Sequence, residues 1–142
     1  MKTAIYPGSF NPWTVGHDDI RDKTLQIFDK IIIWQGVNPT KKPATLLTED
    51  NCAPIGLVKQ GRIEIVNSYG FLHEYVKDKP IHAVVRGLRD SHDFEDEKKT
   101  FYWYEDLGLK IPVVYFITDR SLVHISSSAI RAVEAVKKGV SN

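Results

Sequence analysis

Cysteine is nearly absent from this sequence of 142 residues, in which Cys52 stands alone. A lone cysteine can form neither an internal disulfide nor a cysteine-based metal cluster. Neither positive nor negative charge is in excess, because 19 Lys and Arg residues and 18 Asp and Glu residues give a net charge of +1. Proteins that coat nucleic acid usually carry a clear basic excess. The balance argues against a nucleic-acid partner, and local positive charge must meet any anionic ligand.

Long hydrophobic runs are absent as well. Stretches such as Ile31-Ile32-Ile33-Trp34 are far shorter than the roughly 20 apolar residues that a membrane-spanning helix needs. Met1-Lys2-Thr3 leads directly into a strand-like segment, without the apolar stretch of a secretory signal. We therefore expect a cytoplasmic protein without a membrane partner. Its 42% hydrophobic and 26% charged residues are typical of a globular protein, and its length suits one domain over residues 1–142.

Apolar segments alternate with helical patterns along the chain. Strands are predicted at residues 3–6, 31–36, 62–66, 83–85 and 112–118. Helices are predicted at 17–28, 71–76 and 92–107, and from Ser127 onward, where Ala129, Ile130, Val133 and Val136 are expected to be buried. This alternation predicts an α/β fold: a single Rossmann-like, doubly wound domain with a parallel five-stranded sheet.

Chemistry in such sheets is expected in the loops that follow the strands. The first strand runs into Pro7-Gly8-Ser9, and Gly16-His17 opens the next helix, where free amides and the helix dipole favour an anion. No Gly-Lys-Ser/Thr follows, so this is not a P-loop. The alternative is that Pro7-Gly8 only marks a turn and that His17 is a surface residue. The strand–loop–helix setting favours a functional His17.

Further basic and hydroxyl side chains lie near other strand ends. Lys41 follows the second strand, Arg86 and Arg89 follow the fourth, and three serines (126–128) open the last helix. Arginine forks suit phosphate oxygens, and hydroxyls with free amides can cradle a phosphate. The alternatives are a solvated Lys41-Lys42 pair, surface salt bridges of the arginines with Asp90, Asp93 or Glu95, and an ordinary serine N-cap.

These segments together resemble a known family. Gly8-Ser9-Phe10-Asn11-Pro12 followed by Thr14-Val15-Gly16-His17 is similar to the Thr/His-x-Gly-His signature of the nucleotidyltransferase superfamily. Segments 38–43, 85–89 and 125–128 with Arg131, and the acidic-aromatic helix start at 93–97, resemble the phosphopantetheine adenylyltransferases. The motifs occur in the family's order and spacing across nearly the whole chain.

The resemblance implies transfer of AMP from ATP to 4'-phosphopantetheine, giving dephospho-CoA and pyrophosphate without a covalent enzyme intermediate. It implies that the catalytic residues are His17, Lys41 and Arg89. The implied ATP-binding residues are Ser9, Phe10, His17, Gly87, Leu88, Arg89, Glu97, His124, Ile125, Ser126, Ser127 and Ser128. The implied acceptor-binding residues are Ser9, Lys41, Leu72 and Arg86.

The same resemblance implies Mg²⁺ that arrives with ATP, since magnesium bound to nucleotide phosphates keeps much of its water. The acidic series from Asp90 to Glu97 is interpreted as a solvated helix face, and no protein metal site is expected. The family likeness also points to feedback by CoA and to a homo-oligomer, with a hexamer as the expected form.

Several positions depart from the family pattern. Asn11 replaces the customary aspartate, Thr48 to Gly61 lacks the usual helix opening, and the aromatic run Phe101 to Tyr104 stands where smaller residues are usual. We interpret that run as core, as a subunit contact or as both. These changes leave two alternatives open. One is a related nucleotidyltransferase with another phosphorylated acceptor, such as nicotinamide mononucleotide, and the other is a nucleotide-sensing domain without turnover.

Overall fold

Apolar strands and amphipathic helices alternate along the chain, as the sequence predicts. The computed structural model describes residues 1–37, 40, 45–89, 91–119, 122 and 127–139, without the side chains of 91, 92, 127–129, 138 and 139. In chain order, its elements are β1 (Thr3–Gly8), α1 (Val15–Ile27), β2 (Lys30–Gly36), α2 (Glu49–Cys52), α3 (Ile55–Lys59), β3 (Ile63–Ser68), α4 (Leu72–Val76), β4 (Ala83–Leu88), α5 (Ser91–Asp106), β5 (Val113–Ile117) and α6 (Ser127–Gly139).

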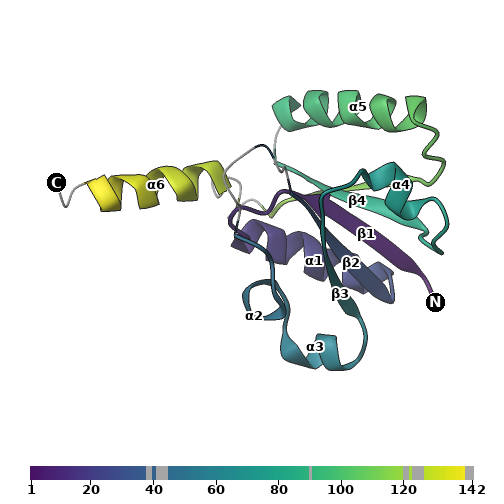
Figure 1. Cartoon of the computed structure of the whole chain (residues 1–142), viewed down its shortest axis with the longest axis horizontal. Helices are drawn as coiled ribbons and strands as arrows, with labels where there is room; N and C mark the ends of the chain where they lie inside the picture. The colour runs from purple at the N-terminus through teal and green to yellow at the C-terminus, as the bar shows by residue number, and fades with distance from the viewer. Residues whose placement is uncertain (38–39, 41–44, 90, 120–121, 123–126, 140–142) are drawn as a thin grey trace.

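The strands form one five-stranded sheet in the order β3-β2-β1-β4-β5, and every pair is parallel. The chain first builds outward from β1 through β2 to β3 and then crosses back to place β4 on the other side of β1 (Figure 1). The order therefore reverses between β1 and β4, which is the switch point where open α/β sheets bind ligands. The predicted parallel, Rossmann-like α/β fold is confirmed.

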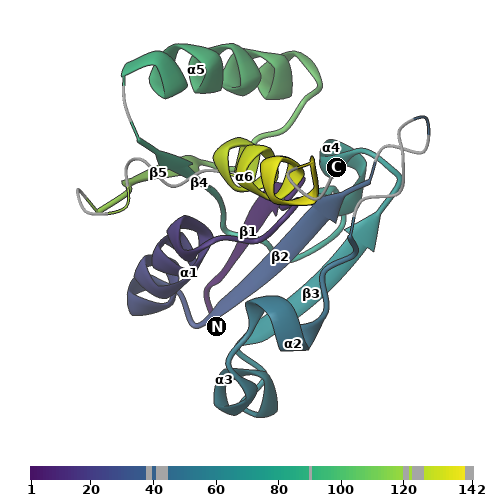
Figure 2. The same ribbon diagram turned by 90° about the vertical axis from the view of Figure 1, so that its left-hand side faces the viewer.

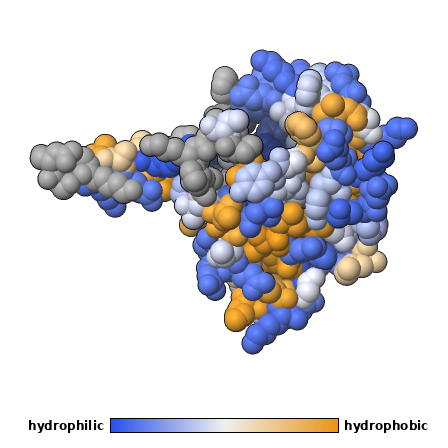
Figure 3. Space-filling view, viewed as in Figure 1, coloured by the Kyte–Doolittle hydropathy of each residue, from blue (hydrophilic) through white to orange (hydrophobic). Residues whose placement is uncertain are grey.

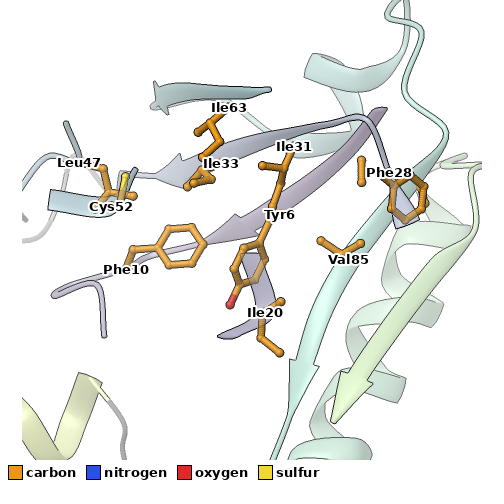
Figure 4. Packing of buried hydrophobic residues seen from close by; sticks show 12 residues of the cluster. Tyr6, Phe10, Ile20, Phe28, Ile31, Ile33, Leu47, Cys52, Ile63 and Val85 are labelled. Atoms are coloured by element: carbon orange, nitrogen blue, oxygen red, sulfur yellow. The ribbon is translucent and has the colours of Figure 1, made fainter. Parts of the chain in front are cut away.

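Helices cover both faces of the sheet: α1, α2 and α3 lie on one face, and α4 and α5 lie on the other (Figures 1 and 2). Successive strand residues point to opposite faces, so each strand supplies two core clusters. Tyr6, Ile33 and Val85 face α1 in one cluster (Figure 4), while Ile32 and Val84 belong to the other cluster, on the α4 side. This core holds the carboxyl ends of the strands in fixed register.

Two strands run further than the sequence predicts. β1 continues through Pro7 and Gly8, which stand in register with Trp34 and Gln35 of β2. β4 continues to Leu88 because β5 pairs with it along that stretch. Arg86 therefore lies within a strand and not in the loop after it. Cross-strand pairing, which a single segment does not reveal, sets both boundaries.

The predicted burial of α6 is wrong for two of its apolar residues. Val133 is 53% exposed and Val136 is 64% exposed. The reason is the helix's position: α6 projects from the rest of the molecule instead of lying on the sheet, and hydrophobic side chains are visible along it (Figure 3). Periodicity predicts which face of a helix is apolar but not what covers that face.

The segment between Thr48 and Gly61 folds into two short helices, α2 and α3, which the sequence did not predict. No helix in the described part of the chain has the length and apolar character needed to cross a membrane.

Candidate active site

A pocket of about 410 Å³ opens at the carboxyl ends of β1 and β4, beside the start of α1. These strands flank the switch point of the sheet. Of the residues predicted to bind ligand, the pocket brings together Ser9, Phe10, His17, Arg86, Gly87, Arg89 and Glu97. Tyr6, Thr14, Asp93, Thr118 and Arg131 also line it. Segments distant in sequence thus converge where the fold predicts a ligand.

The loop after β1 is tightly packed at Gly8. A Cβ atom at Gly8 would lie 2.8 Å from the Phe10 ring, which is too close for any other residue without movement of the ring. Phe10 itself has a φ of 44° and is 3% exposed. A left-handed conformation in a bulky residue costs free energy and persists only where the surrounding structure enforces it. The buried ring therefore holds the backbone of Ser9 at the mouth of the pocket.

The local structure at the start of α1 fixes the tautomer of His17. Thr14 and His17 form a capping box, in which the backbone N–H of Thr14 donates to Nδ1 of His17 at 2.9 Å. Nδ1 therefore accepts and carries no proton, so the proton of the neutral ring is on Nε2. His17 is thus a neutral donor that can offer its Nε2–H to a ligand in the pocket that the residue lines.

Aromatic rings surround this imidazole. The rings of Tyr6, Phe10 and Trp13 lie 6.3, 5.0 and 5.2 Å from it, centroid to centroid. Burial among them lowers the pKa of His17 from 6.5 to about 4, and this exceeds the opposing effect of Asp18. The imidazole is therefore neutral at physiological pH.

Arg86 is oriented by three hydrogen bonds. Its Nε and Nη2 donate to the two carboxylate oxygens of Glu97 at 2.9 and 2.6 Å, and its Nη1 donates to the carbonyl of Pro7 at 2.6 Å. Burial opposes the charged form, but these bonds and the charge of Glu97 outweigh it and raise the pKa of Arg86. The partner differs from the three carboxylates that the sequence suggested, because Glu97 is brought to Arg86 only by the packing of α5 over β4.

Arg89 is held by Asp93 on the first turns of α5. The backbone N–H and Nε of Arg89 donate to one carboxylate oxygen of Asp93 at 3.0 and 3.1 Å. Here one of the suggested salt bridges is confirmed. Between the two arginines, Gly87 has a packing reason of its own, since a Cβ there would lie 2.9 Å from the Ile20 side chain of α1.

Some predicted residues lie elsewhere. Leu72 does not line this pocket but a second one of about 380 Å³, together with Trp34, Phe71, Trp103 and Tyr104. α5 borders both pockets, through Asp93 and Glu97 in the first and Thr100 onward in the second. The aromatic run is accordingly part core and part surface, since Tyr104 packs against the core while Trp103 is 61% exposed.

Several predictions cannot be followed into the structure. Lys41, His124, Ile125 and Ser126 lie outside the described residues. Ser127 and Ser128 begin α6, but their side chains are not described. Leu88 ends β4 without lining the first pocket. Within the described ranges, no group of three or more His, Cys, Asp or Glu side chains could hold a metal ion.

Sequence reasoning missed Tyr6, Thr118 and Gln35. Tyr6 lines the first pocket from a position in β1 that looks like ordinary core, and Thr118 lines it from the position directly after β5. Gln35 is a fully buried polar residue, and a glutamine directly after the apolar run Ile31–Trp34 was the available signal.

Comparison with known proteins agrees with this geometry. The sequence model of the cytidylyltransferase-like family matches residues 5–133. The phosphopantetheine adenylyltransferase of Natranaerobius thermophilus is 35% identical, with 95% of this chain and 84% of that protein covered. The corresponding protein of Flavobacterium johnsoniae is 37% identical, with 94% and 88% covered.

Solved structures support the fold at low sequence identity. The lipopolysaccharide core biosynthesis protein of Thermoplasma volcanium superposes with a TM-score of 0.57 at 16% identity, over 84% of this chain and 98% of that one. The nicotinic acid mononucleotide adenylyltransferase of Plasmodium falciparum, in complex with NaAD, gives a TM-score of 0.57 at 15% identity, over 96% and 89%. The fold, the site and the relatives together show that the chain belongs to the cytidylyltransferase-like family and, within it, to the phosphopantetheine adenylyltransferases.

Proposed function

We propose that this protein is an enzyme that transfers AMP from ATP to 4'-phosphopantetheine and releases dephospho-CoA and pyrophosphate. The observation that carries the proposal is the convergence of a neutral His17 with Arg86 and Arg89 in one pocket at the switch point of the sheet. Membership of the phosphopantetheine adenylyltransferases gives the acceptor. The pocket gives the charge that two phosphorylated substrates need.

The reaction requires no protein nucleophile. A phosphate oxygen of the acceptor forms a bond to the α-phosphorus of ATP, the bond from that phosphorus to the bridging oxygen breaks, and pyrophosphate leaves with the bonding electrons. Positioning and stabilisation of charge supply most of the rate in such transfers. Nε2–H of His17 donates to the α-phosphate as its charge develops. Because Nδ1 is engaged with Thr14, the ring needs no change of tautomer to do so.

The two arginines bind phosphate by exchange of partners. In the structure each guanidinium is held by a carboxylate of α5, Arg86 by Glu97 and Arg89 by Asp93. The acceptor phosphate replaces Glu97 as the partner of one fork of Arg86, and the β- and γ-phosphates of ATP bind Arg89. Arginine forks donate to phosphate oxygens with the same bidentate geometry as to carboxylate oxygens.

The second pocket fits the remainder of the acceptor. It is formed largely by apolar and aromatic side chains, including Leu72, Trp34 and Trp103, whereas a phosphate is expected in the first pocket. Glu97 and Thr100 are three residues apart on α5, which is about one helical turn. An acceptor with its phosphate at Arg86 can therefore extend along α5 into this pocket.

The resemblance adds further proposals for this site. Lys41 would bind the α-phosphate with His17. Ser9 would orient the acceptor phosphate, and the 124–128 segment would bind ATP.

Magnesium would enter with ATP, as part of the substrate. The exposed apolar residues Val133 and Val136 of α6 support a homo-oligomer, for which a hexamer is the expectation from the resemblance. CoA feedback and a cytoplasmic location stay predictions.

The test is pyrophosphate release from MgATP with a panel of acceptors: 4'-phosphopantetheine, nicotinamide mononucleotide and nicotinate mononucleotide, with CTP replacing ATP in a parallel series. We expect turnover with ATP and phosphopantetheine. Activity only with a mononucleotide would move the acceptor assignment. ATP binding without turnover on any acceptor would refute the enzyme and favour a nucleotide sensor.

A further inference from the structure

Gln35 is a fully buried polar side chain near the carboxyl end of β2. It lies in β2 next to apolar residues and is 0% exposed. Burial of an amide costs free energy unless every polar atom finds a partner. Here each does: Nε2 donates to the carbonyl of Ser9 at 2.9 Å and to the carbonyl of Thr45 at 3.0 Å, and Oε1 accepts from the backbone N–H of Leu47 at 2.9 Å.

The partners of Gln35 belong to two separate loops. Ser9 lies in the loop after β1, between Gly8 and the left-handed Phe10. Thr45 and Leu47 lie in the segment that returns to the sheet before α2. One side chain thus ties together the backbones of two loops whose sequence positions are 36 residues apart at Ser9 and Thr45.

A second amide supports the same connection. Gln35 stands in register with Gly8 of β1 on one side and with Asn67 of β3 on the other. Nδ2 of Asn67 donates to the carbonyl of Leu47 at 3.2 Å. The N–H and C=O of Leu47 are therefore bound by amides from neighbouring strands. Sheet register fixes the positions of both amides and, through them, the position of the returning segment.

We propose that Gln35 is a positioning residue for the transfer reaction: it holds the Ser9 loop at a fixed distance from the segment at 45–47. This inference rests on the proposed function. The first loop carries Ser9 and leads into α1, where His17 stands, so the tether fixes the backbone of the group proposed for the acceptor phosphate beside the group proposed for the α-phosphate. Donors that are fixed before reaction stabilise developing charge without reorganisation.

A purely structural role would have a different consequence. Loss of buried hydrogen bonds lowers the free energy of unfolding in either case. A structural residue would lower stability and leave kcat unchanged at temperatures where the protein is folded. A positioning residue would lower kcat much more than it weakens ATP binding, because ATP keeps its other contacts while the two loops lose their alignment.

The experiment uses the full-length protein and two substitutions. Gln35→Met keeps the length and volume of the side chain and removes all three hydrogen bonds. Gln35→Glu keeps the acceptor for Leu47 and removes the donors to Ser9 and Thr45. The matched control is Ile32→Val, in the same strand but on its opposite face, which loses stability without contact to either loop.

For Gln35→Met, we expect kcat to fall at least tenfold and the Kd of ATP to change less than threefold. The control should keep the wild-type kcat. Hydrogen exchange at the Leu47 amide should be faster in Gln35→Met than in wild type, and slower in Gln35→Glu than in Gln35→Met. If Gln35→Met does not fold, the kcat of Gln35→Glu decides the question.

A kcat within twofold of wild type for a folded Gln35 variant would overturn the inference, as would unchanged exchange in residues 8–10 and 45–47 of Gln35→Met. If the wild type turned over no acceptor, the proposed function would fail by itself. Hydrogen exchange would then still show whether Gln35 joins the two loops.

Discussion

Replacement of His17 tests the chemistry of the site most directly. The backbone N–H of Thr14 donates to Nδ1 at 2.9 Å, so Nε2 carries the proton that the α-phosphate accepts. His17→Ala removes this donor. Loss of one donor to developing charge costs about 2–4 kcal/mol of barrier, which corresponds to roughly 30- to 1,000-fold in kcat. ATP affinity should fall much less, since the bond strengthens only as charge develops.

His17→Gln is the matched variant. A glutamine can accept from Thr14 through Oε1 and donate to the phosphate through Nε2, so it should recover part of the lost kcat. The assay is pyrophosphate release under saturating MgATP and phosphopantetheine, with ATP binding measured separately by calorimetry. A loss of ATP affinity as large as the loss of kcat would refute the role in the transition state.

The pH dependence provides a second check. Burial lowers the pKa of His17 to about 4, so the imidazole stays neutral from pH 6 to 8.5. The acceptor phosphate titrates in this range, but its titration affects the wild type and His17→Gln equally. The ratio of kcat/KM between wild type and His17→Gln should therefore be constant. A ratio that rises as pH falls through 6.5 would mean that the imidazolium is the active form, and would refute the tautomer argument.

Three further predictions concern charge and burial. Arg86→Lys should raise the KM for the acceptor at least tenfold in steady-state assays, with a smaller effect on the KM for ATP, because lysine cannot reproduce the fork toward Glu97 together with the bond to Pro7. An equal rise in both KM values would contradict the acceptor role. The lowered pKa of His17 means that the unfolded state binds more protons between pH 6.5 and 4, so wild type should lose stability relative to His17→Gln as pH falls through this window. The difference in urea denaturation should approach roughly 3 kcal/mol at most, and a difference independent of pH would count against it. Burial raises the pKa of Cys52 to about 11, so its thiol should react with Ellman's reagent at pH 8 only after denaturant is added; rapid labelling of the native protein would disprove this.

The strand segments and the position of the site could be predicted because their signals are local. Each buried strand is visible as a short apolar segment, and His17 follows its strand within a readable loop. Helix starts are also local, since Thr14 and His17 are three residues apart and form the capping box. The chemistry at these positions can be predicted from the type of each residue and from its closeness in sequence to the end of a strand.

The surroundings of α6 and the partner of Arg86 could not be predicted in this way. Spacing predicts an apolar face on α6, yet Val133 and Val136 are exposed because the helix lies away from the sheet. Glu97 is 11 residues from Arg86, but it lies on α5 while Arg86 lies on β4, so no spacing within one element connects the two. The pair forms because α5 folds back over β4, and only the tertiary structure fixes that position.

The same distinction separates the residues that react from the residues that hold them. His17, Arg86 and Arg89 lie near strand ends, where sequence patterns identify them. Gln35 is also near a strand end, as the second-last residue of β2, but its side chain is buried and its role depends on the register Gly8–Gln35–Asn67 across three strands. Register arises from the packing of all the strands together. In the sequence, such a residue is only a polar side chain where a buried apolar one is expected. Its function becomes visible when the structure shows the carbonyls of Ser9 and Thr45 hydrogen-bonded to its amide.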